Sequence, residues 1–126
     1  MTSQRAILRA LRRITTLIAV LGLAYLVLRF DLVRLPSDRC SPVTRFAPGD
    51  RLVVDGRPSR LGRGDAVLVM TRSGRIELTL VEAVREEDGA LWCEPDARDC
   101  PGLSSADAGW IDRRAVQGRV LLTWDY

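Results

Sequence analysis

The side chains that could act as nucleophiles lie in a chain that lacks the usual bases to activate them. The 126-residue sequence contains no histidine, and all 19 of its basic residues are arginine rather than lysine. Cys40 and Ser41 stand next to each other, but the cysteine has no histidine partner to hold it as a thiolate. Arginine keeps its proton in proteins and cannot accept one from a serine hydroxyl. These absences argue against nucleophilic catalysis of the common kinds.

The cysteine spacing points to a disulfide rather than to a metal site. Cys93 and Cys100 are separated by six residues that include Pro95 and are typical of a turn. In an oxidising compartment we expect Cys93 and Cys100 to form a disulfide, which leaves Cys40 buried or available for an intermolecular bond. Three cysteines without histidine do not supply four zinc ligands, so the sequence indicates no metal site and no cofactor.

An apolar segment at residues 14–30 follows a basic head at residues 1–13. The run from Ile14 to Leu28 carries no charge, which favours a single transmembrane helix. Because basic residues stay on the cytoplasmic side, we expect a single-pass protein of the inner (plasma) membrane with a cytoplasmic N-terminus. Residues 31–126 would then lie in the periplasm or outside the cell. A cleavable signal peptide and a buried helix are alternatives, although no small-x-small cleavage site is visible.

The charge balance changes after this segment. Residues 1–30 hold five arginines and no acidic residue, whereas residues 31–126 hold fourteen arginines and all sixteen acidic residues. The net charge of +3 therefore comes from residues 1–30, because residues 31–126 have a net charge of −2. This distribution predicts a lipid bilayer as a partner and argues against nucleic acid.

The elements that must position any site belong to a small domain at residues 31–126. Short apolar or β-branched runs occur at residues 51–55, 66–70, 76–84, 91–93 and 119–124. Asp88-Gly89 is a hairpin signal between two of them, and residues 112–116 can form one helical turn. The expected fold class is mostly β, with a single N-terminal transmembrane helix followed by a small β domain.

Two Gly-Asp pairs, Gly49-Asp50 and Gly64-Asp65, stand directly before two of these runs. Glycine permits a positive φ, and the carboxylate can accept hydrogen bonds from backbone N–H groups at a strand entry. With the N-terminal anchor, the stretch PGDRLVVDGRPSRLGRGDAVLV at residues 48–69 resembles type I signal peptidases. A second resemblance lies at residues 105–124, where Ser105-Ala106-Asp107 leads through Gly118-Arg119 to the last strand. The resemblance implies a signal-peptidase-like β domain in which both pairs form structural turns beside the binding groove.

The resemblance also suggests site residues. The family's nucleophilic serine lies eight residues before the first Gly-Asp pair, and counting back gives Ser41, whereas alignment on Pro42 places Arg39 there instead. The family's lysine base falls at Val81, and the nearest substitute base is Glu82. The resemblance therefore implies that the chain keeps the fold of the family but has lost the ability to hydrolyse peptides.

We accordingly expect a membrane-anchored, non-catalytic protein. It would bind an extended peptide by strand addition, or act as an accessory or structural subunit beside other membrane-protein subunits. The alternative is an active serine endopeptidase that processes signal peptides or a specific exported precursor, with Ser41 as its nucleophile.

Overall fold

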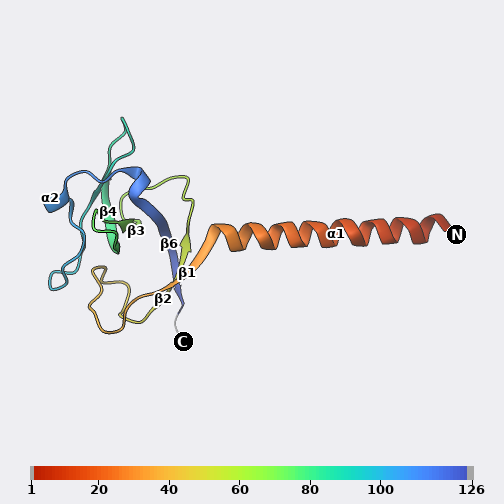
Figure 1. Ribbon diagram of the computed structural model, residues 1–126, viewed down its shortest axis with the longest axis horizontal. Coiled ribbons are helices and arrows are strands. Elements are labelled where there is room, and N and C mark those ends of the chain that lie inside the picture. Colours follow the sequence, from red (N-terminus) through yellow and green to blue (C-terminus); the bar gives the residue numbers. More distant parts are fainter. Residues whose placement is uncertain (1, 125–126) are drawn as a thin grey trace. The chain divides into compact units, whose positions relative to one another are not determined.

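A computed structural model describes residues 2–124 and divides the chain into two compact units, Met1–Phe30 and Asp31–Tyr126. The first unit is the helix α1, Thr2–Arg29, and the second carries the strands and two short helical turns (Figure 1).

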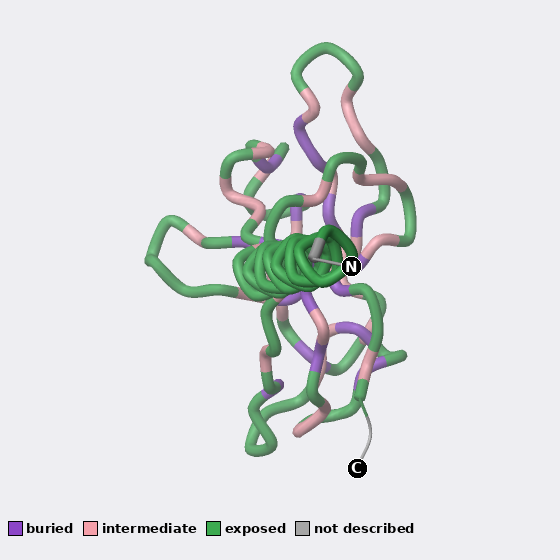
Figure 2. Tube along the Cα trace, turned by 90° about the vertical axis from the view of Figure 1, so that its right-hand side faces the viewer, coloured by how far each residue is buried: buried purple, intermediate pink, exposed green. Residues whose placement is uncertain are grey.

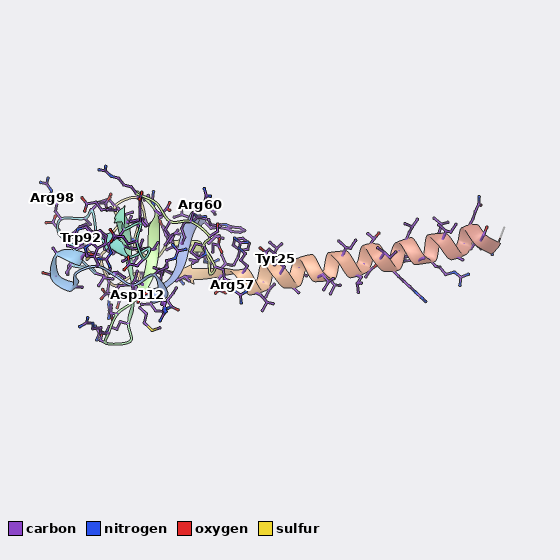
Figure 3. All side chains as sticks on the ribbon, turned by 90° about the horizontal axis from the view of Figure 1, so that it is seen from above. Tyr25, Arg57, Arg60, Trp92, Arg98 and Asp112 are labelled. Atoms are coloured by element: carbon purple, nitrogen blue, oxygen red, sulfur yellow. A yellow bond between two sulfur atoms is a disulfide. The ribbon has the colours of Figure 1, made fainter. Side chains whose placement is uncertain are left out.

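The helix α1 begins at Thr2, well before the apolar segment predicted from residue 14. The head is rich in alanine, leucine and arginine, which are good helix formers, so the helix extends through it. From Ser3 to Arg29 the helix is long and apolar enough to cross a membrane, with a length of roughly 40 Å at about 1.5 Å per residue. Its side chains project on all sides (Figure 3), and residues 3–28 are exposed throughout (Figure 2).

The second unit is built on a six-stranded sheet with the order β1-β2-β6-β3-β4-β5. The pairs β2–β6, β6–β3, β3–β4 and β4–β5 are antiparallel. A short helix α2, Ser105–Ala108, and a 3₁₀ turn, Arg113–Ala115, precede the last strand. The strands are β1 Phe30–Arg34, β2 Arg51–Asp55, β3 Ala66–Met70, β4 Ile76–Val84, β5 Leu91–Cys93 and β6 Val116–Trp124.

Four strands, β2 to β5, begin and end at the predicted residues, and the helical turn predicted within residues 112–116 is present. With its long helix and antiparallel sheet, the whole chain is mixed α and β rather than mostly β. The strand β6 begins at Val116 instead of residue 119. The strand β1 takes Phe30 out of the segment predicted as transmembrane and starts immediately after Arg29.

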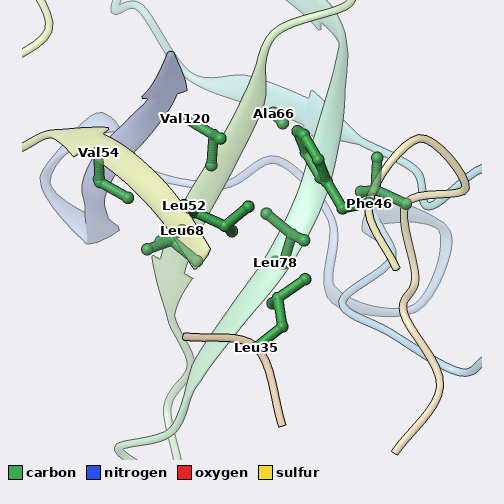
Figure 4. Packing of buried hydrophobic residues seen from close by; sticks show 9 residues of the cluster. Leu35, Phe46, Leu52, Val54, Ala66, Leu68, Leu78 and Val120 are labelled. Carbon is green, nitrogen blue, oxygen red and sulfur yellow. The ribbon is translucent and has the colours of Figure 1, made fainter. Parts of the chain in front are cut away.

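The central strand β3 separates two hydrophobic clusters on opposite faces of the sheet. Ala66 and Leu68 belong to the first, and Val67 and Val69 belong to the second, as the alternation of a strand requires. The first core cluster, drawn in Figure 4, comprises Leu35, Val43, Phe46, Leu52, Val54, Ala66, Leu68, Leu78 and Val120. The second core cluster comprises Val67, Val69, Val81, Leu91, Cys93 and Ile111.

Candidate functional site

Ser41 lies in the loop between β1 and β2 and is half-buried. Its hydroxyl donates a hydrogen bond of 2.8 Å to the backbone carbonyl of Val43, which is itself fully buried. Within residues 2–124, no hydrogen bond joins this hydroxyl to a carboxylate. The hydroxyl is therefore held by its own loop rather than by a general base.

The loop that carries Ser41 is fixed to the segment that follows β5. A disulfide joins Cys40 to Cys100, with 5.7 Å between the two Cα atoms. The carboxylate of Asp96 accepts 2.8 Å and 2.7 Å hydrogen bonds from the backbone N–H and the hydroxyl of Thr44. Burial opposes the charge on Asp96, but these two bonds, a backbone hydrogen bond at Asp96 itself and the positive charge of Arg45 together lower its pKa. The two segments thus form one wall beside the serine.

A close approach of Gly102 to Pro42 completes this wall. A Cβ atom at Gly102 would lie 2.8 Å from the Cβ atom of Pro42, which is closer than side-chain carbons pack. The backbone N–H of Ala97 donates to the carbonyl of Pro42 at 3.1 Å. The glycine is therefore required by contact with the serine loop rather than by a turn.

The predicted disulfide between Cys93 and Cys100 is wrong, because Cys100 pairs with Cys40. Cys93 is the last residue of β5, and its thiol is fully buried in the second core cluster. Burial raises the pKa of this thiol to about 11, with a smaller contribution from Glu94. The side chain of Cys93 packs into the sheet, so it is unavailable to the loop cysteine that follows it.

Ser41 lines a groove of about 360 Å³. Apolar side chains of β1, β3 and β4 form one part of it, and four prolines from the loops form much of the rest. Its charged side chains are Arg34, Arg39 and Glu77, so the alternative nucleophile position of the sequence comparison, Arg39, also faces this space. The full lining is Val33, Arg34, Leu35, Pro36, Arg39, Cys40, Ser41, Pro42, Pro48, Leu68, Ile76, Glu77, Leu78, Pro101 and Gly102.

The first half of β4 presents an open edge at this groove. β5 pairs only with the stretch from Val81 to Val84, so Ile76 to Leu78 lies beyond its end. The N–H of Val81 donates to Asp65 beside β3, whereas the carbonyl of Leu80 accepts from Glu94 on the other side.

Backbone groups alternate between the two sides of an antiparallel strand. The odd-numbered residues of β4 therefore bond toward β3, and the even-numbered residues point away from it. The N–H and C=O groups of Ile76 and Leu78 accordingly face the open edge, and both residues line the groove.

Glu82 does not share this site. It is an exposed residue of β4, at the register shift where β4 meets β5, and it is absent from the groove lining. The acidic residue that does line the groove with Ser41 is Glu77. The sequence comparison missed Glu77 because only the extent of β5 shows which part of β4 is uncovered.

The two Gly-Asp pairs form the same turn twice. Gly49 and Gly64 have φ angles of 88° and 90°, which favour glycine. The carboxylates of Asp50 and Asp65 each accept a 2.8 Å hydrogen bond from the backbone N–H three residues earlier. The predicted turn chemistry is confirmed, and these residues shape strand entries rather than line the groove.

An aromatic and basic cluster lies at the hairpin between β4 and β5. The rings of Trp92 and Trp110 meet edge to face with 5.3 Å between their centroids, and Arg85 lies 5.0 Å from the centroid of Trp110. Arg85 also donates from Nε to Asp88 at 2.8 Å, and this bond lowers the pKa of Asp88 to about 2.

No known relative helps to assign a function to this site. Among residues 2–124, no three histidine, cysteine or carboxylate side chains gather to hold a metal ion. Comparison of the chain with models of known protein families, with curated proteins and with solved structures finds no match.

Proposed function

We propose that this chain is a membrane-anchored protein that binds an extended peptide in the Ser41 groove without cutting it. The observation that carries the proposal is the open edge of β4, where the backbone groups of Ile76 and Leu78 face a groove of about 360 Å³. A peptide strand laid along this edge satisfies those groups and places alternate side chains against apolar walls. The resemblance of residues 48–69 to signal peptidases supports the same mode of binding.

The chemistry of the groove favours holding a peptide over hydrolysing it. A serine hydroxyl needs an adjacent base to become a useful nucleophile. Ser41 instead donates to the carbonyl of Val43. The charged residues that line the groove with it are Glu77 and two arginines, which keep their protons.

The proposed location follows from α1 and the disulfide. We place α1 across the inner (plasma) membrane with the basic head in the cytoplasm, because arginines precede the apolar run. The β domain then lies in the periplasm or outside the cell, where a disulfide such as Cys40–Cys100 persists.

A binding test uses the full chain in lipid nanodiscs and an array of short peptides. For a peptide that binds, methylation of alternate backbone nitrogens distinguishes strand addition from side-chain capture. Because only every second peptide N–H points at β4, methylating one alternate set is expected to abolish binding and methylating the other set to preserve it. Equal effects of both sets would contradict strand addition.

A matched pair of variants locates the bound peptide. Glu77→Gln changes a groove residue, whereas Glu82→Gln changes an exposed residue of the same strand outside the groove. We expect only Glu77→Gln to alter affinity. If no peptide of the array binds, the accessory or structural subunit becomes the better account.

A serine endopeptidase is the second candidate function, because Ser41 and Glu77 line the same groove beside an open strand edge. Mass spectrometry of the array peptides after incubation tests this candidate. Turnover by the wild type that disappears in Ser41→Ala would establish the peptidase and overturn the non-catalytic account.

A further inference from the structure

Trp110 is half-exposed beside the hairpin between β4 and β5, outside the groove described above. It is 42 % exposed although Trp92 and Arg85 pack against it. The backbone next to it is fixed, because Ile111 exchanges two 2.8 Å backbone hydrogen bonds with Leu91. An exposed aromatic ring whose position is already fixed loses little conformational entropy when a ligand packs against it.

Two pockets meet at Trp110. The first has a volume of about 550 Å³ and the second a volume of about 640 Å³, and both are lined by Trp110 and Asp112. A ligand that packs on the indole can therefore extend into both pockets. This arrangement suits an elongated ligand of several units better than a single small group.

The first pocket is lined by Arg85, Arg113 and Arg114, and we call it the arginine pocket. Arg85 is already paired, because it donates to both carboxylate oxygens of Asp88. Arg113 donates to a backbone carbonyl, and among residues 2–124 no ion pair joins Arg113 or Arg114 to a carboxylate. With three arginines and two aspartates, Asp88 and Asp112, the pocket has one net positive charge. Arg113 and Arg114 are thus available to pair with an anionic group of a ligand.

The second pocket combines polar and apolar residues, and we call it the hydroxyl pocket after Thr71 and Ser73 in its lining. The hydroxyls of Thr71 and Ser73 share one hydrogen bond of 2.8 Å. That bond uses only one of the two hydroxyl protons, so the other can be donated to a ligand. Asp107 also lines this pocket, and its apolar lining consists of Val69, Met70, Leu103, Ile111 and Ala115.

The backbone beside Trp110 offers no template for a peptide strand. On the outer edge of β5, Leu91 is bonded to Ile111, and the N–H of Cys93 donates to the hydroxyl of Ser105 at 2.8 Å. A ligand at this site must therefore be recognised by side chains rather than by strand addition. A sugar ring has an apolar C–H face that can pack on an indole, and its hydroxyls project from the ring edge. An acidic sugar adds a carboxylate, which arginine binds through charge-assisted hydrogen bonds.

We infer that Trp110 and the two pockets bind an acidic oligosaccharide. One sugar ring packs on the indole, a carboxylate pairs with Arg113 and Arg114, and hydroxyls of the next sugar bond to Thr71 or Ser73. No residue of this site lines the groove of Ser41, so the inference does not depend on peptide binding. The proposed position of the domain outside the cytoplasm would bring the site to surface polysaccharides.

Fluorine NMR of the full chain labelled with 5-fluorotryptophan tests this site. The chain has three tryptophans, Trp92, Trp110 and Trp124, so replacing each by phenylalanine assigns the three resonances. The protein is held in a detergent without a sugar headgroup. The acidic probes are tetrasaccharides of hyaluronan and of polygalacturonate, and the neutral probe is chitotetraose. We expect an acidic tetrasaccharide to shift the Trp110 resonance saturably, chitotetraose to bind about tenfold more weakly because it lacks the carboxylates, and the Trp124 resonance to stay in place.

A matched pair of variants tests the acidic contact. Arg114→Gln changes an exposed arginine of the arginine pocket, whereas Arg98→Gln changes an exposed arginine that lines neither pocket. We expect Arg114→Gln to weaken binding of the acidic tetrasaccharide about tenfold and to leave chitotetraose unaffected. Arg98→Gln should alter neither affinity. Far-ultraviolet circular dichroism of each variant confirms that the fold is unchanged.

Several results would overturn the inference. One is a Trp110 resonance that neither acidic tetrasaccharide shifts. Another is equal affinity for chitotetraose or for a tetraglutamate peptide, because the site would then select neither the acidic sugar nor a sugar at all. Equal weakening by Arg114→Gln and Arg98→Gln would reduce the contact to general charge attraction. Each of these results leaves the proposed peptide groove untouched, since the groove is tested with its own ligands and variants.

Discussion

Apolar side chains on β3 are buried on both faces of the sheet, whereas those at the end of β6 are exposed on one face. Val67 and Val69 of β3 are buried in the second core cluster, and Leu68 is buried in the first. On β6, Val120 is buried but Leu122 and Trp124 are half-exposed. The β3–β4–β5 half of the sheet therefore holds most of the packing, and the β1–β2–β6 half offers a surface. Substitutions in the β3–β4–β5 half should therefore mainly affect stability, and substitutions in the β1–β2–β6 half should mainly affect contact with other molecules.

The largest expected effect comes from the bond that joins the two halves. The Cys40–Cys100 disulfide spans 60 residues and links the β1–β2 loop to the segment after β5. Replacing both cysteines by alanine should lower the free energy of unfolding by about 4 kcal/mol, because the unfolded chain loses its loop constraint. Denaturant unfolding followed by tryptophan fluorescence measures this loss. An unchanged midpoint, or a Cys93–Cys100 peptide in the non-reduced digest of the wild type, would contradict the pairing.

The next largest effect is expected when a leucine is replaced by alanine in each half of the sheet. Leu91 is fully buried in the second core cluster, so Leu91→Ala should cost about 3 kcal/mol through lost burial and the remaining cavity. Leu122 of β6 is half-exposed, so Leu122→Ala should change stability by less than about 0.5 kcal/mol. Equal losses would show that Leu122 is as deeply buried as Leu91 and would remove the distinction between the two halves.

The hairpin of the packed half should show a small dependence on acid. The hydrogen bond from Arg85 lowers the pKa of Asp88 to about 2, below its usual value of about 3.8. A carboxyl with a lowered folded pKa stabilises the fold above its unfolded pKa, and that stability is lost as the pH falls from about 4 to about 2. Unfolding curves of wild type and Asp88→Asn should therefore differ at neutral pH and converge near pH 2. Glu86→Gln, which removes another carboxylate from the same hairpin, serves as the control variant.

The sequence was sufficient for the strands whose signals are local. Runs such as Ala66–Met70 are apolar and β-branched, and a Gly-Asp turn with a positive φ stands before each of two strands. β1 was not predicted because Phe30, Leu32 and Val33 extend the apolar character of the anchor beyond Arg29, and a short apolar stretch does not distinguish helix from strand.

The site depended on contacts between distant segments and was harder to predict. Three cysteines allow three pairings, and only the burial of Cys93 in a strand decides among them. Glu82, which the resemblance suggested as a substitute base, lies outside the groove that Ser41 lines, whereas Glu77 lines it. Which of them faces the groove depends on where β5 ends, and no residue of β4 encodes that.

The most direct test of the peptide-binding account is amide hydrogen exchange of β4 in the full chain, with and without a peptide taken from the array. The account predicts that the bound peptide slows exchange at Ile76 and Leu78, whose N–H groups face the open edge. Exchange at Glu77 and Thr79, whose N–H groups point toward β3, should already be slow and change less. Unchanged exchange at Ile76 and Leu78 with the peptide bound would contradict strand addition at this groove.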